Sequence, residues 1–178
     1  MRNPVPAFSP AQHPTHAFVK LFLVALIVSG CTLRKHQLPD TFDPQEVAFI
    51  HKVGTATING QAFLTRRDGI VVYAAGKNVY LIPSGKYARA RLNLIYKGLG
   101  RSYFLRGIEP ESPGYLQNIK STVADGEGRF TFAKLSAGSY HLVTTVHWYA
   151  DDIQQGGSIH KKVTLKAGET TRVIMNGY

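Results

Sequence analysis

The sequence predicts an all-β fold, a single β-sandwich of about seven strands. Short segments rich in aromatic and β-branched residues recur along residues 53–178, and turn residues separate them at intervals of about eight to twelve residues. Within the segments, apolar and polar residues alternate, which is typical of strands with one buried face. No helical period persists for more than about two turns, and no repeat of about 20–50 residues occurs.

The strand signals begin at residue 55. In the segment 55–64, Ala56, Ile58, Ala62 and Leu64 share one parity and polar residues take the other, so one face of this strand is expected to be buried. The other expected strands are 70–74, 78–83, 129–132, 139–149, 158–166 and 170–176. Turns that contain glycine separate several of them, as at 75–77 and 167–169.

The stretch 124–142, ADGEGRFTFAKLSAGSYHL, has a structural explanation for each of its features. Its glycines supply the positive φ angles of a tight turn after Asp125. Phe130 and Phe132 then lie on one face of the next strand. In the strand 139–149, one face carries Tyr140, Leu142, Val146 and Trp148, and the other carries His141, Val143, Thr145 and His147. We therefore expect a turn and two strands here rather than a catalytic site.

The same stretch resembles the carboxypeptidase regulatory-like domain, whose hallmark is D-x-x-G-x-F-x-F followed by L-x-x-G-x-Y-x-L. The matching residues are Asp125, Gly128, Phe130, Phe132, Leu135, Gly138, Tyr140 and Leu142. Upstream, INGQAF and AAGKNVYLIP are similar to earlier strands of that family. The resemblance implies a transthyretin-like sandwich that is non-catalytic and acts as an accessory or binding module. It brings no peptidase residues with it.

Residues 83–117 form the least regular region. Only 90–96 and 102–107 read as strands, so we expect a long loop, and long ordered loops are often functional. The region is basic and rich in tyrosine, which suits binding of anionic lipid headgroups or acidic polysaccharide. Nucleic acid is not an expected partner, because the chain is expected to be exported. A solvated positive face is the alternative. Its candidate binding residues are Lys86, Tyr87, Arg89, Arg91, Tyr96, Lys97, Arg101, Tyr103 and Arg106.

The amino-terminal region has the pattern of an export signal. Lys20 precedes an apolar run from Leu21 to Val28, which small residues and then Cys31 follow. Ten or so apolar residues are too few to span a bilayer, so we interpret 1–30 as a signal peptide. VSGC resembles the bacterial lipobox, which implies lipidation of Cys31, and Thr32 by the same resemblance implies the outer membrane, facing the periplasm. The alternative is an ordinary signal peptide.

Residues 31–52 are polar, contain Pro39 and Pro44, and show no sustained period. We expect a tether between the membrane and the folded domain, with a short helical turn in DPQEVAFI. The expected organisation is thus a signal peptide at 1–30, a tether at 31–52 and the sandwich at 53–178.

Candidate catalytic and metal-ligating residues are sparse. Asp125 with Glu127, and Asp151 with Asp152, lie in turns and lack the spacing of a calcium loop. His141 and His147 would lie about 20 Å apart on one strand, so His160 could join only one of them. We expect these histidines to be exposed. The sequence contains no G-x-S-x-G, S-x-x-K or phosphate-binding loop, so no enzyme, metal or cofactor is predicted.

Composition adds a bias toward anionic partners. The chain has 21 basic and 11 acidic residues, and a single cysteine. We predict a lipid-anchored envelope lipoprotein whose non-catalytic sandwich binds carbohydrate or an anionic envelope polymer, with Trp148, Tyr149 and the loop tyrosines as aromatic platforms. One alternative is a structural lipoprotein subunit of an envelope or secretion complex that docks a partner protein. The other is an enzyme whose site is assembled from distant residues.

Overall fold

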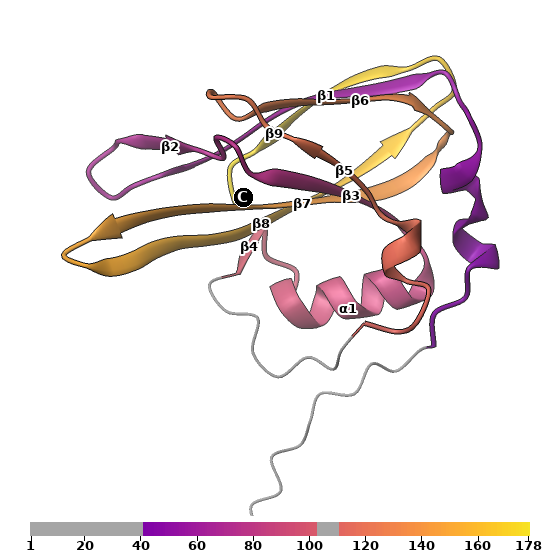
Figure 1. Cartoon of the computed structure of the whole chain (residues 1–178), viewed down its shortest axis with the longest axis horizontal. Coiled ribbons are helices and arrows are strands. Elements are labelled where there is room, and N and C mark those ends of the chain that lie inside the picture. Colours follow the sequence, from indigo (N-terminus) through magenta and orange to yellow (C-terminus); the bar gives the residue numbers. More distant parts are fainter. Residues whose placement is uncertain (1–40, 103–110) are drawn as a thin grey trace, which may run out of the picture. The chain divides into compact units, whose positions relative to one another are not determined.

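Nine β-strands form two sheets that pack face to face in the computed structural model, which describes residues 41–102 and 111–178 (Figure 1). The predicted all-β sandwich is confirmed, with nine strands in the described residues where about seven were expected. Cys31, Tyr103 and Arg106 lie outside the described residues.

The first sheet is built on β1 (Ala56–Thr65). This strand pairs antiparallel with β2 (Val71–Tyr73) and β6 (Arg129–Leu135) and parallel with β9 (Thr170–Met175). The residues of β1 that the sequence assigns to the buried face are indeed fully buried. The alternation of apolar and polar residues therefore predicts this strand correctly.

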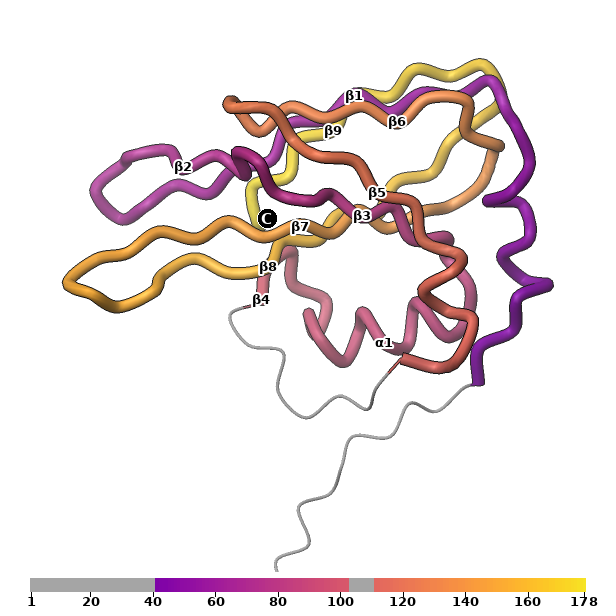
Figure 2. The backbone as a smooth tube through the Cα atoms, in the orientation of Figure 1, coloured from indigo at the N-terminus to yellow at the C-terminus, as the bar shows by residue number. Residues whose placement is uncertain are grey.

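The second sheet has the order β4 (Arg101–Ser102), β8 (Ile153–Leu165), β7 (Gly138–Ala150), β3 (Asn78–Pro83) and β5 (Lys120–Val123). Strands β7 and β8 form a long hairpin that closes at Asp151 and Asp152, whose φ angles are 50° and 60°. Two positive φ angles are typical of a two-residue turn whose twist matches the strands. The β7–β8 hairpin and the β1–β2 hairpin project at the same end of the sandwich (Figure 2).

The core lies between the two sheets and joins side chains from all the long strands. Tyr140 is fully buried there, stacks edge-on with Phe49 at 5.4 Å between ring centroids, and donates a hydrogen bond from its hydroxyl to the Ser136 carbonyl at 2.7 Å. A buried tyrosine that bonds to backbone a few residues upstream fixes a corner of a sandwich. Trp148 is partly buried and packs against the edge of this core.

The turn before β6 and the strands that follow it hold the glycine, aspartate and aromatic residues to which the sequence gives a structural role. Asp125 Oδ1 accepts hydrogen bonds from the backbone N–H groups of Glu127 at 2.9 Å and Arg129 at 2.8 Å. Gly128 has a φ of 73° and lies against the Ala62 carbonyl. Phe130, Phe132, Leu135 and Leu142 are buried in the core. These residues therefore shape the fold, as predicted from their spacing.

The structure corrects two expectations about the connecting segments. Residues Lys86–Tyr96 form helix α1, not part of a loop with a strand at 90–96. Residues Gln45–His51 form a 3-10 helix, η1, which confirms the short helical turn expected in DPQEVAFI. Its Val47 and Ile50 are buried, however, so the last part of the expected tether packs on the sandwich. A second short 3-10 helix, η2, spans Leu116–Asn118. In the described residues, none of the helices has the length and apolar content needed to cross a membrane.

Candidate functional site

Helix α1 covers part of the outer face of the five-stranded sheet (Figure 1). Ala88, Leu92 and Tyr96 lie four residues apart on the buried side of the helix, as expected when one helical face packs against a sheet. Their neighbours are Ile82 of β3 and Tyr115, which precedes η2. This second apolar cluster lies between the helix and the sheet, and the sheet separates it from the main core.

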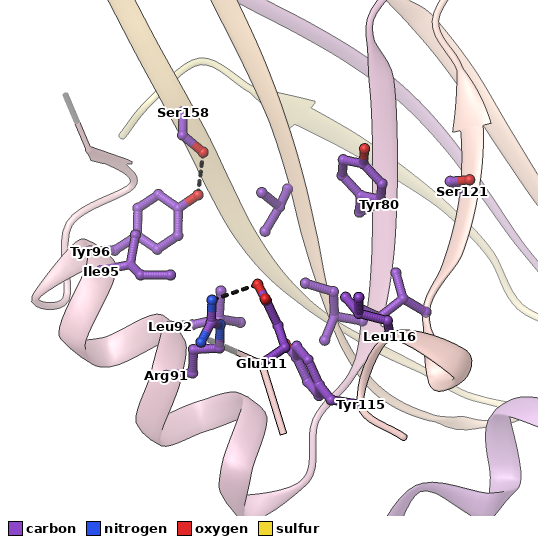
Figure 3. Close-up of a pocket in the computed structure, with 13 residues that line it drawn as sticks. Tyr80, Arg91, Leu92, Ile95, Tyr96, Glu111, Tyr115, Leu116, Ser121 and Ser158 are labelled. Carbon is purple, nitrogen blue, oxygen red and sulfur yellow. Dashed lines mark hydrogen bonds and ion pairs between the residues drawn. The ribbon is translucent and has the colours of Figure 1, made fainter. Parts of the chain in front are cut away.

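A groove of about 660 Å³ lies between α1, the segment that leads into η2, and the outer face of β3, β5 and β7 (Figure 3). The sheet contributes Tyr80, whose side chain is 41% exposed, and Ser121 beside it. Apolar side chains from the helix and sheet complete the floor. The full lining is Tyr80, Ile82, Arg91, Leu92, Ile95, Tyr96, Glu111, Tyr115, Leu116, Ile119, Ser121, Val143 and Ser158.

An ion pair crosses the groove from the helix to the opposite wall. Arg91 Nη2 lies 2.6 Å from Glu111 Oε1 (Figure 3). The Arg91 side chain is only 12% exposed, whereas that of Glu111 is 38% exposed. The pair presents both a donor-rich guanidinium and a carboxylate at the groove, and such groups can bind hydroxyls of a ligand in addition to each other.

A buried hydroxyl chain closes the other end of the groove. The Tyr96 hydroxyl bonds to Ser158 Oγ (Figure 3). Ser158 Oγ in turn donates to the Thr144 carbonyl at 3.3 Å. Burial raises the pKa of Tyr96 to about 12, and the hydrogen bond with Ser158 opposes this effect only in part. Tyr96 is therefore a neutral donor that holds the end of α1 to β8.

The amino-terminal end of α1 is capped by a residue distant in sequence. Glu46 of η1 accepts a hydrogen bond from the Lys86 backbone N–H at 2.8 Å, and its other oxygen lies 3.4 Å from Lys86 Nζ. The backbone hydrogen bond from Lys86 is the main cause that lowers the pKa of Glu46. A carboxylate at this end of a helix satisfies free N–H groups and the helix dipole.

The opposite wall is held by an aromatic cluster. Tyr87 and Tyr115 meet edge-on at 4.9 Å between centroids, and Phe42 contacts both rings. The Tyr87 hydroxyl accepts a hydrogen bond from the Ser112 N–H at 2.9 Å. Burial raises the pKa of Tyr115 above its ordinary value. Tyr115 therefore lines the groove with a mostly buried ring, and Tyr87 supports it from behind.

Two histidines meet beneath α1, contrary to the expectation that they are exposed. His141 is 4% exposed, its Nδ1 lies 2.8 Å from His160 Nε2, and its Nε2 lies 3.0 Å from Ser84 Oγ. His160 in turn stacks on Tyr96 at 4.8 Å between centroids. Burial and, to a lesser degree, the neighbouring positive charges lower the pKa of His141 to about 4, and burial lowers that of His160.

A sequence signal could have found this pair. A two-residue turn at Asp151 and Asp152 sets a register in which Val143 opposes His160. His141 then lies two positions along the strand from that partner, which makes the two histidines diagonal neighbours on one face. The contact between His141 and His160 follows when the two-residue turn is taken as the centre of a hairpin and residues are paired across it. Distances measured along a single strand do not reveal it.

The basic residues predicted to form one binding surface lie in several separate places in the structure. Lys86 pairs with Glu46, Arg89 Nη1 donates to the Ser84 carbonyl at 2.9 Å, and Lys97 ends α1 with a φ of 49°. Tyr87 and Tyr96 are buried. Of the described candidates, only Arg91 and Tyr96 line the groove, and Arg101 lies in a different cleft.

The acidic candidates remain in turns. Asp125 organises its own turn, and Glu127 pairs with Arg129. Within residues 41–102 and 111–178, no three side chains of the metal-ligating types His, Cys, Asp and Glu lie close enough together to hold an ion.

Solved structures include proteins that are similar to this chain. It matches the crystal structure of a "putative carbohydrate binding protein" from Pseudomonas aeruginosa with a TM-score of 0.65 and 26% sequence identity. The match covers 78% of this chain and 99% of the other. No protein-family model matches the chain, and no curated protein does.

Proposed function

We propose that this protein is a non-catalytic carbohydrate-binding module and that the groove between α1 and the five-stranded sheet is its saccharide site. The groove itself is the observation that carries the proposal, because it combines an exposed tyrosine ring with a polar pair on an apolar floor. Ligand sites of this kind use aromatic surface for contact and a few polar groups for orientation. The similarity to a protein whose name gives it carbohydrate binding supports the same function.

In this site, the Tyr80 ring would contact the apolar face of a sugar, while Arg91 and Glu111 would bind its hydroxyls. The floor of Ile82 and Val143 excludes water below the ligand. The fixed position of Arg91, which Glu111 holds at 2.6 Å, reduces the entropy lost on binding. The resemblance to the carboxypeptidase regulatory-like family supports the binding role and is part of the proposal.

The proposal is tested with Tyr80→Ala. A panel of envelope and peptidoglycan saccharides is screened against the full chain in a detergent without a sugar headgroup, and the affinity of each hit is measured by calorimetry. We expect the substitution to weaken binding about ten-fold or more, because a central aromatic contact is lost.

Tyr73→Ala is the matched control, because Tyr73 is also 41% exposed but lies on β2 outside the groove. We expect it to leave saccharide affinity unchanged. Equal losses in both variants, or no saccharide bound by the parent chain, would contradict the proposal.

We further propose that the module is anchored in the outer membrane through a lipid on Cys31 and faces the periplasm. The apolar run before VSGC supports this. When cells are labelled with radioactive palmitate, we expect the parent chain to carry label and Cys31→Ser to carry none. Equal labelling of both chains would overturn the anchor without affecting the saccharide site.

A further inference from the structure

The β1–β2 and β7–β8 hairpins project at the same end of the sandwich (Figure 2). Residues of both hairpins line a second cleft, of about 760 Å³. The turn that follows β1 forms one wall, and the end of the β7–β8 hairpin forms the other. Its lining residues are Thr65, Arg66, Arg67, Asp68, Arg101, Trp148, Ala150, Gln155, Gly156 and Tyr178. None of these residues lines the groove under α1, so the two sites are separate.

The side chains that line the cleft carry a net positive charge. Arg66 and Arg67 come from the β1–β2 turn and Arg101 comes from β4, whereas Asp68 is the one acidic side chain among the lining residues. One Asp68 oxygen lies 2.7 Å from Arg66 Nη2 and the other accepts the Ile70 N–H at 3.2 Å. Because this pair balances one arginine with one carboxylate, the excess positive charge of the lining side chains equals that of the other two arginines, Arg67 and Arg101. Walls that converge with one sign of charge concentrate ions of the opposite sign between them.

Trp148 gives the cleft an aromatic wall. It lies on the face of β7 that carries the core residues, and it packs against the edge of that core while also lining the cleft. Its cross-strand partner is Gln155, whose side chain lies on the same face and adds an amide donor and acceptor. A flat indole beside an amide is suited to a sugar ring and its hydroxyls.

The combination of groups selects among ligands. Arginine binds a carboxylate through two parallel hydrogen bonds, and the indole provides rigid apolar contact that a small inorganic anion cannot use. A neutral sugar would leave the arginines without a ligand charge, and an inorganic ion would leave the indole without a ring to contact. A saccharide that bears carboxylates uses both.

We propose that the cleft between the two hairpins is a second binding site, specific for an acidic saccharide with carboxylate groups. Trp148 contacts the sugar ring, and Arg66, Arg67 and Arg101 bind its carboxylates. The site stands on its own residues and does not depend on the groove under α1.

Trp148 is the only tryptophan of the chain, so its fluorescence reports on this cleft directly. The full chain, in an uncharged detergent without a sugar headgroup, is titrated with tri-galacturonate, with tri-mannuronate and with the methyl ester of tri-galacturonate. We expect a saturable change in emission with at least one acidic trisaccharide, and about ten-fold weaker binding of the neutral ester. No change with either acid, or equal affinity for the ester, overturns the proposal.

Sulfate at matched ionic strength separates a saccharide site from a general anion site. We expect it to compete weakly and without a saturable change in emission. If sulfate alone reproduces the saccharide response at the same concentrations, the cleft binds anions without selecting sugars and the proposal is wrong.

Variants assign the signal to the cleft. We expect Arg66→Gln with Arg67→Gln to weaken the acidic saccharide about ten-fold or more. Arg129→Gln is the matched control, since Arg129 also pairs with an acid two residues away, Glu127, in an exposed turn outside the cleft. Tyr80→Ala should leave the Trp148 response intact, which keeps failure of this site distinguishable from failure of the groove. Equal weakening in the double variant and the control would overturn the assignment.

Discussion

Replacement of Gly128 by alanine should lower the free energy of unfolding by about 3 kcal/mol or more. Its φ of 73° disfavours any residue with a Cβ. A Cβ built there would lie 2.3 Å from the Ala62 carbonyl oxygen, which is backbone and cannot rotate away. The shift would also disturb the hydrogen bond that the Ala62 N–H donates to the Gly128 carbonyl at 2.9 Å. Urea denaturation followed by Trp148 fluorescence measures the loss.

Gly126→Ala is the control, because Gly126 belongs to the same turn but a Cβ there meets no atom within 4 Å. We expect its free energy of unfolding to remain within about 0.5 kcal/mol of the parent value. Similar losses at the two positions would show that the turn is sensitive to any substitution, and the explanation from φ and the Ala62 carbonyl would be wrong.

Acid should destabilise the fold through His141, the second large effect. The unfolded chain binds a proton at this residue below about pH 6.5, whereas burial lowers the folded pKa to about 4. Neutral His141 therefore makes its full contribution to the free energy of unfolding above the pKa of the unfolded chain. This contribution is lost as the pH falls toward the pKa of the folded protein. His160, Lys162 and Arg89 add positive charge around the ring, and His160 shifts in the same direction.

The measurement compares the parent chain with His141→Gln, which cannot take up the proton. Between about pH 7.5 and about pH 4.5, the parent should lose about 2 kcal/mol more of its free energy of unfolding than the variant loses. His147→Gln, on the same strand but partly exposed, is the control and should follow the parent. Parallel pH profiles for the parent and His141→Gln would contradict the prediction.

The strands could be predicted because each carries its own pattern. In β1 the alternation of Ala56, Ile58, Ala62 and Leu64 corresponds directly to burial. In the turn before β6, the side chain of Asp125 and the absence of one at Gly128 act within a few residues of each other. Such local structure can be predicted from the sequence because the interactions that stabilise it involve only residues of the same short segment.

Helix α1 was missed because its causes lie elsewhere in the chain. Leu92, Leu94 and Tyr96 alternate like a strand, but the buried residues of the helix are Tyr87, Ala88, Leu92 and Tyr96, whereas Leu94 is not buried. Residue 85 is a glycine with no side chain to cap the helix, and the cap comes from Glu46, which lies 40 residues before Lys86. The basic residues of this region therefore do not form one exposed loop.

The two candidate sites were missed for a related reason. Arg91 meets Glu111 across 20 residues, and the arginines of the β1–β2 turn share a cleft with Trp148 only because two hairpins project together. The sequence suggests Trp148 and the tyrosines as aromatic platforms, and the structure separates them: Tyr87 and Tyr96 are buried, whereas Trp148 lines a cleft.

The contacts of Phe42 and Glu46 have a mechanical consequence. Both residues precede β1, yet they hold the aromatic wall and the capped end of α1 rather than either sheet. Tension that enters the domain from the chain before residue 41 is therefore transmitted first to the walls of the groove.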